Sequence, residues 1–329
     1  MKLTVIGAGA WGTALAIVLS SRHEVALWAR DAELVRDMRM TRENRRFLPG
    51  IALPAPVRIV TDLAAAAPAA GLLIVATPLA GLRGILRQLR DVASAVPLIW
   101  VCKGFEPGSG QLPHQVADEE LGGGTARGAL TGPSFAEEVA RGLPAAITLA
   151  SRDGLFARRV AAELHGGRLR IYANDDLIGA ETAGGAKNIL AIAAGISDGL
   201  GFGHNARAAL VTRGLAEITR LGVALGGRPG TFMGLAGMGD LLLTCTGDLS
   251  RNRRVGLALA AGKTLPRILA ELGHVAEGVG TAREVAALAQ RLSIDMPITQ
   301  AVDAILHRGE SAFDAVEKLL GRESKAESV

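Results

Sequence analysis

Short apolar runs alternate with amphipathic stretches along the first 175 residues of the chain. Eight of these runs are predicted to be strands: Lys2–Ile6, Glu24–Trp28, Val57–Val60, Leu72–Ala76, Leu98–Val101, Ala129–Thr131, Ala145–Leu149 and Leu169–Tyr172. Helical patterns fit between several of them, for example over Ala10–Ser21, Leu79–Val92 and Leu155–Leu164. Strands that alternate with helices form parallel βαβ units, so this part is predicted to be an α/β domain with a mostly parallel, doubly wound sheet.

The character of the chain changes near Asp176. From there on, long Ala- and Leu-rich stretches are separated by glycines, and β-branched runs are few. This pattern predicts an all-α C-terminal domain. No low-complexity linker separates the halves, so we expect two directly joined domains, residues 1–175 and residues 176–329.

The composition excludes several classes of protein. The 329 residues are 49% hydrophobic and carry a net charge of only +4, which argues against disorder, and no apolar run approaches the roughly 20 residues of a membrane span. The chain starts with the apolar stretch MKLTVIGAGAWGTALA, which resembles a signal peptide. The glycines of GAGAWG interrupt it, which is typical of a strand followed by a helix and favours a cytoplasmic protein over a secreted one. Cys102 and Cys245 lie far apart, as expected in a reducing compartment.

The excess of basic residues does not indicate nucleic-acid binding. Such binding calls for clustered basic residues interleaved with aromatic ones, but aromatic residues make up only 3% and the arginines are scattered. Only six of the 36 basic residues are lysines. Because lysine, unlike arginine, can be tuned to exchange a proton near neutral pH, each interior lysine is a candidate for chemistry.

A dinucleotide-binding pattern lies at the start of the chain. Gly7, Gly9 and Gly12 form G-x-G-x-x-G directly after the first predicted strand and at the start of a predicted helix. In a Rossmann-type domain the three glycines allow the tight turn, the approach of a pyrophosphate and the packing of helix on strand, and the helix N-terminus faces the phosphates. The alternative is a tight turn that merely tolerates glycine.

Arg30 follows the second predicted strand, where an NAD-specific site usually has an acidic residue. A guanidinium at this place can accept a 2′-phosphate, so use of NADP is compatible with the sequence, although Asp31 is adjacent and a solvated loop arginine fits equally well.

Two further strand ends and one helix have candidate groups. Lys103 follows the strand that ends at Val101, at the sheet edge where doubly wound folds bind ligands. Gly132 and Ser134 offer a backbone N–H and a hydroxyl, or form an ordinary Gly-Pro turn. Lys187 is expected in the first turns of a long apolar helix, where burial and the helix dipole both lower a lysine pKa; the alternative is a surface lysine.

The last candidates lie downstream. Asp240 is suited to accept hydrogen bonds from a lysine or a substrate hydroxyl. Ser250, Arg251 and Asn252 combine a hydroxyl, a guanidinium and an amide, a set suited to phosphate oxygens; the alternative is a solvated helix start capped by Ser250. Zinc-protease, P-loop and nucleophile-elbow motifs are absent and the six histidines are scattered, so we expect no metal site and no histidine-based triad.

The ordered motifs together resemble the bacterial NAD(P)-dependent glycerol-3-phosphate dehydrogenases. They are GAGAWGTALA (residues 7–16), CKG (102–104), TGPSFAEEVA (131–140), GGAKN (184–188), GMGDLLLTCT (237–246), SRNRRVG (250–256) and AEGVGTA (276–282). Ala10 stands where many members have serine, and Met238 stands where leucine is common. The resemblance implies a Rossmann domain followed by a helical substrate domain, a homodimer, and net reduction of dihydroxyacetone phosphate to supply glycerol 3-phosphate for phospholipids.

The resemblance also implies roles for individual residues. Lys187 would be the catalytic proton acceptor and donor. The substrate would be bound by Lys103, Gly132, Ser134, Lys187, Asp240, Ser250, Arg251 and Asn252. The NAD or NADP cofactor would be bound by Gly7, Gly9, Ala10, Trp11, Gly12, Arg30, Lys103, Ala136, Arg251, Val275 and Glu277.

Two alternatives stay open at this point. The β-hydroxyacid, 6-phosphogluconate and ketopantoate reductases share the two-domain plan and a helix lysine, although the SRNRR segment favours a phosphorylated triose. A non-catalytic nucleotide sensor would also keep the glycine motif, but it would have little use for Lys103, Lys187 and Asp240 together.

Overall fold

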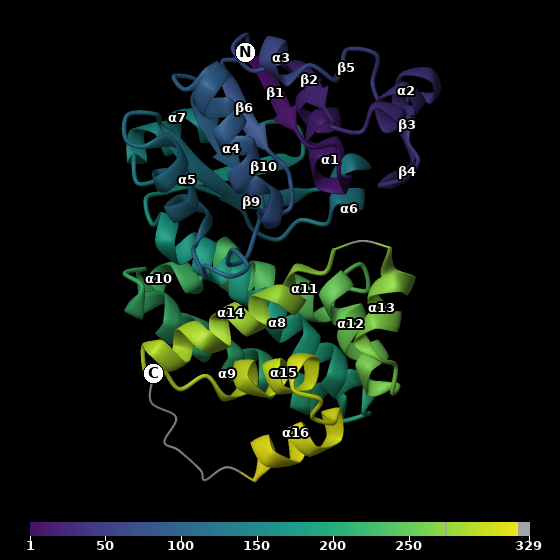
Figure 1. Ribbon diagram of the computed structural model, residues 1–329, viewed down its shortest axis with the longest axis vertical. Coiled ribbons are helices and arrows are strands. Elements are labelled where there is room, and N and C mark those ends of the chain that lie inside the picture. Colours follow the sequence, from purple (N-terminus) through teal and green to yellow (C-terminus); the bar gives the residue numbers. More distant parts are fainter. Residues whose placement is uncertain (274, 322–329) are drawn as a thin grey trace. The chain divides into compact units, whose positions relative to one another are not determined.

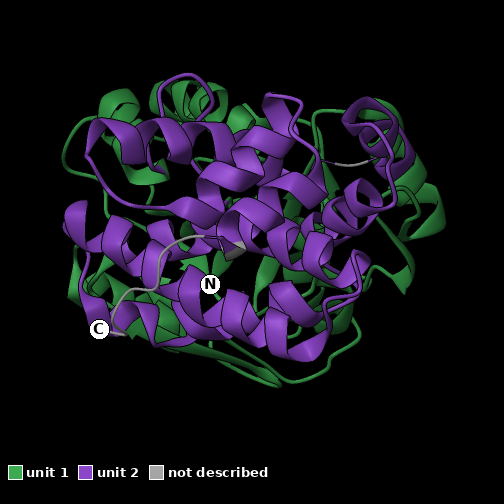
Figure 2. Cartoon of the chain, turned by 90° about the horizontal axis from the view of Figure 1, so that it is seen from below, with its two compact units in different colours: residues 1–102, 113–177 green, residues 103–112, 178–329 purple. Residues whose placement is uncertain are grey.

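The computed structural model describes residues 1–273 and 275–321. Within this part the chain forms two compact units (Figures 1 and 2). Unit 1 comprises Met1–Cys102 and Pro113–Leu177, and unit 2 comprises Lys103–Leu112 with the chain from Ile178 onward. The expected division at residue 175 placed the segment Lys103–Leu112 in the first domain; its contacts place it in unit 2.

Unit 1 is built on a sheet of eight strands. The strands of the unit are β1 (Lys2–Ile6), β2 (Glu24–Trp28), β3 (Glu43–Asn44), β4 (Leu48–Ala52), β5 (Arg58–Val60), β6 (Leu72–Val75), β7 (Leu98–Trp100), β8 (Arg127–Thr131), β9 (Ala145–Ala150) and β10 (Leu169–Asn174). The order across the sheet is β10-β9-β8-β7-β6-β1-β2-β5, and β3 pairs only with β4 in a small hairpin. All neighbours are parallel except β8 and β9, which confirms the expectation of a mostly parallel sheet.

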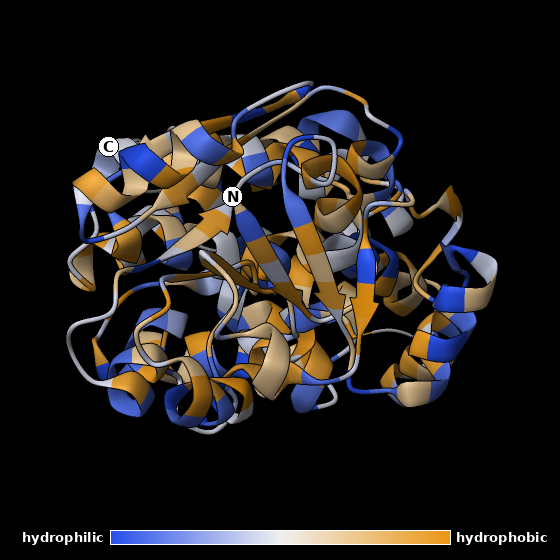
Figure 3. Ribbon diagram, turned by 90° about the horizontal axis from the view of Figure 1, so that it is seen from above, coloured by the Kyte–Doolittle hydropathy of each residue, from blue (hydrophilic) through white to orange (hydrophobic). Residues whose placement is uncertain are grey.

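The helices of unit 1 follow the strands as the apolar pattern predicts. They are α1 (Ala10–Leu19), α2 (Ala32–Thr41), α3 (Leu63–Ala66), α4 (Leu79–Ala93), α5 (Pro113–Leu121), α6 (Ala136–Ala140) and α7 (Gly154–Leu164). Apolar residues of α1, α2 and α7 form one core cluster with side chains from one face of the strands. The inner strands β1, β2, β6 and β7 are buried on both faces, and the sheet is largely orange in Figure 3.

The chain order fixes where this sheet can bind a ligand. From β1 the chain goes to β2 on one side, and later to β6 on the other side of β1. The carboxyl end of β1 is therefore a topological switch point, which is the usual binding place in doubly wound sheets. The segments after β1, β2, β7 and β8 share this edge, since these strands run in the same direction.

Unit 2 is helical. Its elements are α8 (Leu177–Gly199), α9 (Gly203–Ala224), α10 (Pro229–Phe232), the π-helical turn η1 (Leu235–Gly239), α11 (Asp240–Thr246), α12 (Arg251–Ala260), α13 (Leu265–Leu272), α14 (Glu277–Arg291), α15 (Pro297–His307) and α16 (Ala312–Leu320). From Ile189 to Ile196 α8 is buried on all sides, so it is the central helix of the unit. No helix in the described residues is long and apolar enough to span a membrane.

The segment Lys103–Leu112 joins unit 2 for a physical reason. Phe105 and Leu112 are buried in the apolar core that α8 organises. The backbone N–H of Gly108 donates to Glu284 Oε1 on α14 at 2.9 Å. The glycines at 104, 108 and 110 adopt positive φ, which lets so short a segment turn repeatedly. Lys103 therefore belongs to unit 2, although only Val101 and Cys102 separate it from the end of β7.

Candidate active site

The glycine motif forms the loop that the sequence predicts. Gly7 adopts φ +118°, and its N–H donates to the Trp28 carbonyl at 2.9 Å. A Cβ on Gly12 would lie 2.0 Å from the Gly7 carbonyl oxygen, so helix α1 packs directly against the loop. No atom lies within 4 Å of the position that a Cβ on Gly9 would take, and Gly9 begins α1 without a side-chain cap. The loop therefore has the open approach and uncapped N–H groups that a pyrophosphate requires.

A buried asparagine that the sequence analysis missed holds this loop in place. Asn44 on β3 is fully buried, and its Nδ2 donates to the Ala8 carbonyl at 2.9 Å and to Thr13 Oγ1 at 2.8 Å. Nothing in the local sequence marks Asn44, because its two partners are more than 30 residues away along the chain.

The loop after β2 separates the roles of Arg30 and Asp31. Asp31 caps α2, with Oδ1 accepting from the N–H groups of Glu33 and Leu34, while Oδ2 pairs with Arg46 at 3.1 Å. The hydrogen bond from the Leu34 N–H is the main cause that lowers the pKa of Asp31. Both oxygens of this carboxylate have protein partners, whereas Arg30 is exposed. The arrangement favours Arg30 over Asp31 as the residue that contacts a dinucleotide at this place.

The remaining residues expected in unit 1 lie at or near the same edge. Gly132 directly follows β8 with φ +130°, and the Ser134 hydroxyl donates to its carbonyl at 3.1 Å, so these residues form a local turn. Ala136 begins α6, which packs against α1, the helix that contains Ala10 and Trp11.

Unit 2 contains a cluster of two lysines and one carboxylate, in which Lys187 and Asp240 are buried and Lys103 is part-buried. Lys187 Nζ donates to Asp240 Oδ1 at 2.6 Å, and Lys103 Nζ donates to Asp240 Oδ2 at 2.5 Å. Asp240 is 1% exposed and Lys187 6% exposed, which excludes the surface-lysine alternative. Asp240 follows directly on the π-helical turn η1, an irregularity that is frequent at functional sites. One carboxylate thus fixes both ammonium groups.

Thr244 completes this cluster and was also missed. Lys187 Nζ donates to Thr244 Oγ1 at 2.6 Å, and the threonine hydroxyl donates to the Asp240 carbonyl at 2.6 Å. The available signal was its position four residues after Asp240, on the same face of the helix that Asp240 begins.

Burial lowers the pKa of Lys187 to about 8; the charge of Asp240 opposes this shift and the charge of Lys103 adds to it. The expectation that the helix dipole contributes was wrong. Helix α8 begins at Leu177, so Lys187 lies in its third turn, beyond the reach of the N-terminal dipole. A lysine with a pKa near 8 can exchange a proton at physiological pH.

The starts of α12 and α14 meet beside α8. Asn252 Nδ2 donates to Asn188 Oδ1 at 2.9 Å, and Asn252 Oδ1 accepts from the Gly278 N–H at 3.0 Å. Asn188, next to Lys187, is a further residue that the sequence analysis left out. Through these hydrogen bonds, the segment Ser250–Asn252 and the first turn of α14 lie next to α8, the helix that contains Lys187. Glu277 is part of that first turn of α14.

The residues expected around phosphate differ in exposure. Ser250 caps α12 by accepting from the Arg253 N–H at 3.2 Å, as the alternative interpretation held, but it is buried rather than solvated. Arg251 is exposed at the first position of that helix. Val275 is 54% exposed, just before the start of α14.

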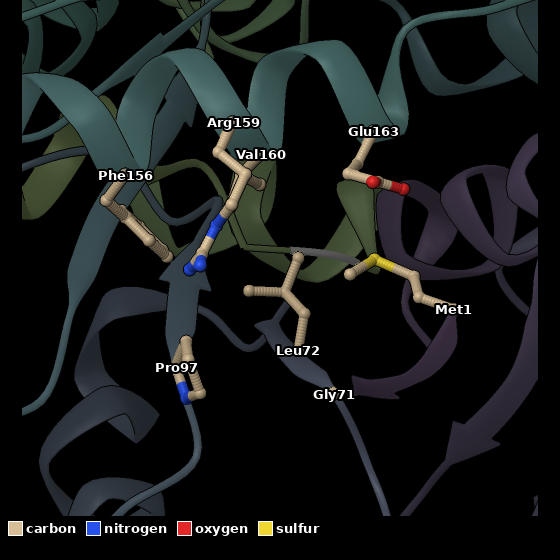
Figure 4. Close-up of a pocket in the computed structure, with 8 residues that line it drawn as sticks. All are labelled: Met1, Gly71, Leu72, Pro97, Phe156, Arg159, Val160 and Glu163. Carbon is tan, nitrogen blue, oxygen red and sulfur yellow. The ribbon is translucent and has the colours of Figure 1, made fainter.

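One hollow lies away from all of these residues. A cavity of about 300 Å³ opens at the amino ends of the parallel strands (Figure 4). It is lined by Met1, Gly71, Leu72, Pro97, Phe156, Arg159, Val160 and Glu163. Doubly wound sheets bind their ligands at the opposite edge, so we do not count this cavity among the candidate sites.

Replacing Gly12 with alanine is expected to weaken dinucleotide binding at least about tenfold and to lower stability by about 1–3 kcal/mol, because the new Cβ would force helix and loop apart. Calorimetric titration with the dinucleotide and thermal unfolding measure the two effects. Gly9→Ala is the matched control for stability, since its Cβ meets nothing, yet it should also weaken binding. Wild-type stability of Gly12→Ala would contradict the packing argument.

Comparison with known proteins identifies relatives of the whole chain. The family model "NAD-dependent glycerol-3-phosphate dehydrogenase N-terminus" matches residues 2–157, and the corresponding C-terminus model matches residues 176–317. The curated glycerol-3-phosphate dehydrogenase [NAD(P)+] of Dechloromonas aromatica is 61% identical over 327 residues, covering 99% of both chains. That of Aromatoleum aromaticum is also 61% identical, covering 99% of this chain and all of the relative.

Solved structures agree with these relatives. The crystal structure of the Coxiella burnetii glycerol-3-phosphate dehydrogenase superposes with a TM-score of 0.93 at 42% identity, over 98% of this chain and 99% of that one. A ketopantoate reductase from Ralstonia eutropha, one of the alternatives considered, has a TM-score of 0.60 at 16% identity, over 96% of this chain and all of that one, and so shares the fold alone. The chain belongs to the NAD-dependent glycerol-3-phosphate dehydrogenase family.

Proposed function

We propose that this protein interconverts sn-glycerol 3-phosphate and dihydroxyacetone phosphate with NAD(H) or NADP(H). The observation that carries the proposal is the buried pair of Lys187 and Asp240, with Lys103 on the second carboxylate oxygen. A nucleotide sensor has no need for such a cluster, whereas oxidation of an alcohol needs a group that takes up its proton. The family membership of the entire chain supports the same reaction.

The proposed mechanism divides the chemistry between the cofactor and the chain. When bound, the nicotinamide dinucleotide exchanges a hydride with the substrate carbon. Neutral Lys187 accepts the hydroxyl proton when glycerol 3-phosphate is oxidised, and the Lys187 ammonium returns it to the carbonyl oxygen in the reverse direction. The charge of Lys103 stabilises the negative charge that develops on this oxygen, and Asp240 orients both lysines.

Binding roles follow from the positions of the other residues. We assign the pyrophosphate to Gly7, Gly9 and Gly12 with the start of α1, and the adenosine end to Arg30. We assign the substrate phosphate to Arg251 with Ser250 and Asn252, and further substrate contacts to Gly132 and Ser134. Lys103 and Arg251 are proposed to contact the cofactor as well as the substrate, and Ala10, Trp11, Ala136, Val275 and Glu277 remain further proposed cofactor contacts.

The direct test uses purified protein with dihydroxyacetone phosphate and either NADH or NADPH. We expect loss of nicotinamide absorbance with both, because Arg30 is exposed while both oxygens of Asp31 are engaged. No oxidation of either cofactor would overturn the proposal. Turnover of a ketopantoate or a 3-hydroxyacid in place of the triose phosphate would reassign the substrate.

The pH dependence should follow Lys187. Because the pKa of Lys187 is about 8 and the proton acceptor must be neutral, kcat/KM for oxidation should be highest above pH 8. Below pH 8 it should decrease about tenfold for each pH unit. The same parameter for reduction should decrease above pH 8, because the donor must be charged. The control variant is Lys263→Gln, which should keep the wild-type pH dependence, since Lys263 is part-exposed and paired with Glu271. A pH-independent kcat/KM in both directions would exclude Lys187 as the titrating group.

The cellular setting is also a proposal. We place the protein in the cytoplasm, where reduction of dihydroxyacetone phosphate would supply glycerol 3-phosphate for phospholipid synthesis. We further propose a homodimer, which a mass determination by light scattering tests directly: a mass equal to that of one chain would exclude it.

A further inference from the structure

A largely buried carboxylate in the last turn of α8 joins three helices of unit 2. Asp198 Oδ2 accepts from Arg253 Nε at 3.0 Å and from Arg253 Nη2 at 2.7 Å. The same oxygen accepts from Arg207 Nη1 at 3.0 Å. Asp198 belongs to the last turn of α8, Arg207 to the second turn of α9, and Arg253 to the first turn of α12. We call these three residues the Asp198 clamp.

The clamp is the main restraint on the Arg253 side chain. The side chains of Asp198 and Arg253 are each 12% exposed, so their attraction is weakly screened. Arg253 also donates to Asp248 Oδ1 at 2.9 Å, but Asp248 is 96% exposed, and exposed pairs contribute little. Loss of Asp198 would therefore leave a largely buried guanidinium without an effective counter-charge.

The backbones of the same two helices are in direct contact next to the clamp. A Cβ on Gly195 of α8 would lie 2.1 Å from the Arg253 carbonyl oxygen. A Cβ on Gly256 of α12 would lie 2.0 Å from the Ile192 carbonyl oxygen. The glycines set how closely α12 approaches α8, while the Asp198–Arg253 pair sets how the first turn of α12 is rotated and translated along it.

This first turn is where the proposed phosphate contacts lie. Ser250 caps the turn through the N–H of Arg253 itself, and Arg251 and Asn252 are its first two residues. We propose that Asp198, acting through Arg253, is a positioning residue that fixes this turn for the phosphate group of the substrate. The inference rests on the proposed function, and it makes Arg253, unlike Arg251, a structural arginine that does not touch the substrate.

The test is the steady-state kinetics of Asp198→Asn with dihydroxyacetone phosphate. We expect KM to rise about tenfold, since displacement of binding groups by even an ångström has effects of this size or more, and kcat to change less than about threefold. Inhibition by inorganic phosphate, competing with the triose phosphate, should weaken by a similar factor. The dissociation constant of NADPH should change much less than KM, because most of the proposed cofactor contacts lie outside this turn. Asp248→Asn, which removes only the exposed partner of Arg253, should match the wild type throughout.

Two further variants separate positioning from a general loss of stability. Val302→Ala removes buried apolar volume on α15, which contains none of the clamp residues, so it should lower the unfolding temperature and leave KM unchanged. The double variant Asp198→Asn/Arg253→Gln should have a KM close to that of Asp198→Asn alone, because both changes break one interaction. If Asp198→Asn does not fold, Arg207→Gln removes one donor and should raise KM by a smaller factor.

The outcomes are distinguishable. Wild-type protein without turnover would refute the proposed function itself. An active wild type with an unchanged KM in folded Asp198→Asn would refute the inference, as would a KM increase in Val302→Ala at equal loss of stability. A raised KM in Arg253→Gln together with a lowered KM in Asp198→Asn would make Arg253 a direct phosphate ligand, which also overturns it.

Discussion

Replacing Lys187 with methionine is expected to reduce kcat about 10³-fold in both directions while NADPH binding stays unchanged. Methionine has a similar length but cannot exchange a proton, and positioned acid–base groups contribute about 10²–10⁴-fold. Asp240 keeps its pair with Lys103, so the buried carboxylate is not left without a counter-charge. Steady-state kinetics and calorimetric titration with NADPH measure the two properties.

Two controls make this result specific. Lys263→Met replaces a part-exposed lysine of the same unit and should keep wild-type turnover. In Lys187→Ala, added methylamine should restore part of the activity, with a pH dependence that follows the added amine. Retention of more than about a tenth of kcat in Lys187→Met would remove Lys187 from the proton transfer, given the size of acid–base effects.

Replacing Asp240 with asparagine should lower stability more than replacing Lys187 with methionine does. The carboxylate is 1% exposed and accepts from two ammonium groups, and an amide would remove the negative charge that faces both of them. Breaking a buried ion pair from one side is destabilising by about 3–5 kcal/mol, and we expect a loss in this range with a further lowered pKa of Lys187 and little turnover. Denaturant unfolding gives the free energy.

A second substitution tests the charge argument. In Lys103→Met/Asp240→Asn one of the two ammonium groups is gone, so part of the lost stability should return, although turnover should not. The exposed Asp248→Asn serves as the matched control and should unfold like the wild type. A stable Asp240→Asn single variant would show that the lysines do not depend on this carboxylate.

The sequence predicts elements whose side chains repeat a simple pattern. Most strands of the main sheet are recognisable because they are short runs of largely buried apolar residues, and α8 because its middle part, from Ile189 to Ile196, is apolar on all sides. The hairpin of β3 and β4 was not predicted, since β3 has only two residues and both are polar. The reversed direction of β9 relative to β8 leaves no trace in residue type.

The site residues likewise fall into those that the sequence reveals and those that only the structure reveals. Gly7, Gly9 and Gly12 stand out because of their spacing between a predicted strand and a predicted helix, and Lys187 because a lysine is unusual in an apolar helix. Asn44 and Asp198 do not, because an exposed loop has the same residues in abundance, and only contacts with distant segments give them a role. Burial was expected to lower the pKa of Lys187 and does so. The expected contribution of the helix dipole was wrong, because sequence shows where a residue lies on a helix only when the start of the helix is known.

The contact of α8 with α12 through Gly195 and Gly256 sets a limit for engineering of this protein. Where helices meet through side chains, a larger residue can be absorbed by changing rotamers, and active-site geometry drifts gradually. Here backbone meets backbone, so a directed-evolution library that varies these two positions should return almost only glycine. Attempts to accommodate a bulkier substrate would have to lengthen or remodel the segment before Ser250 and leave the helix pair untouched.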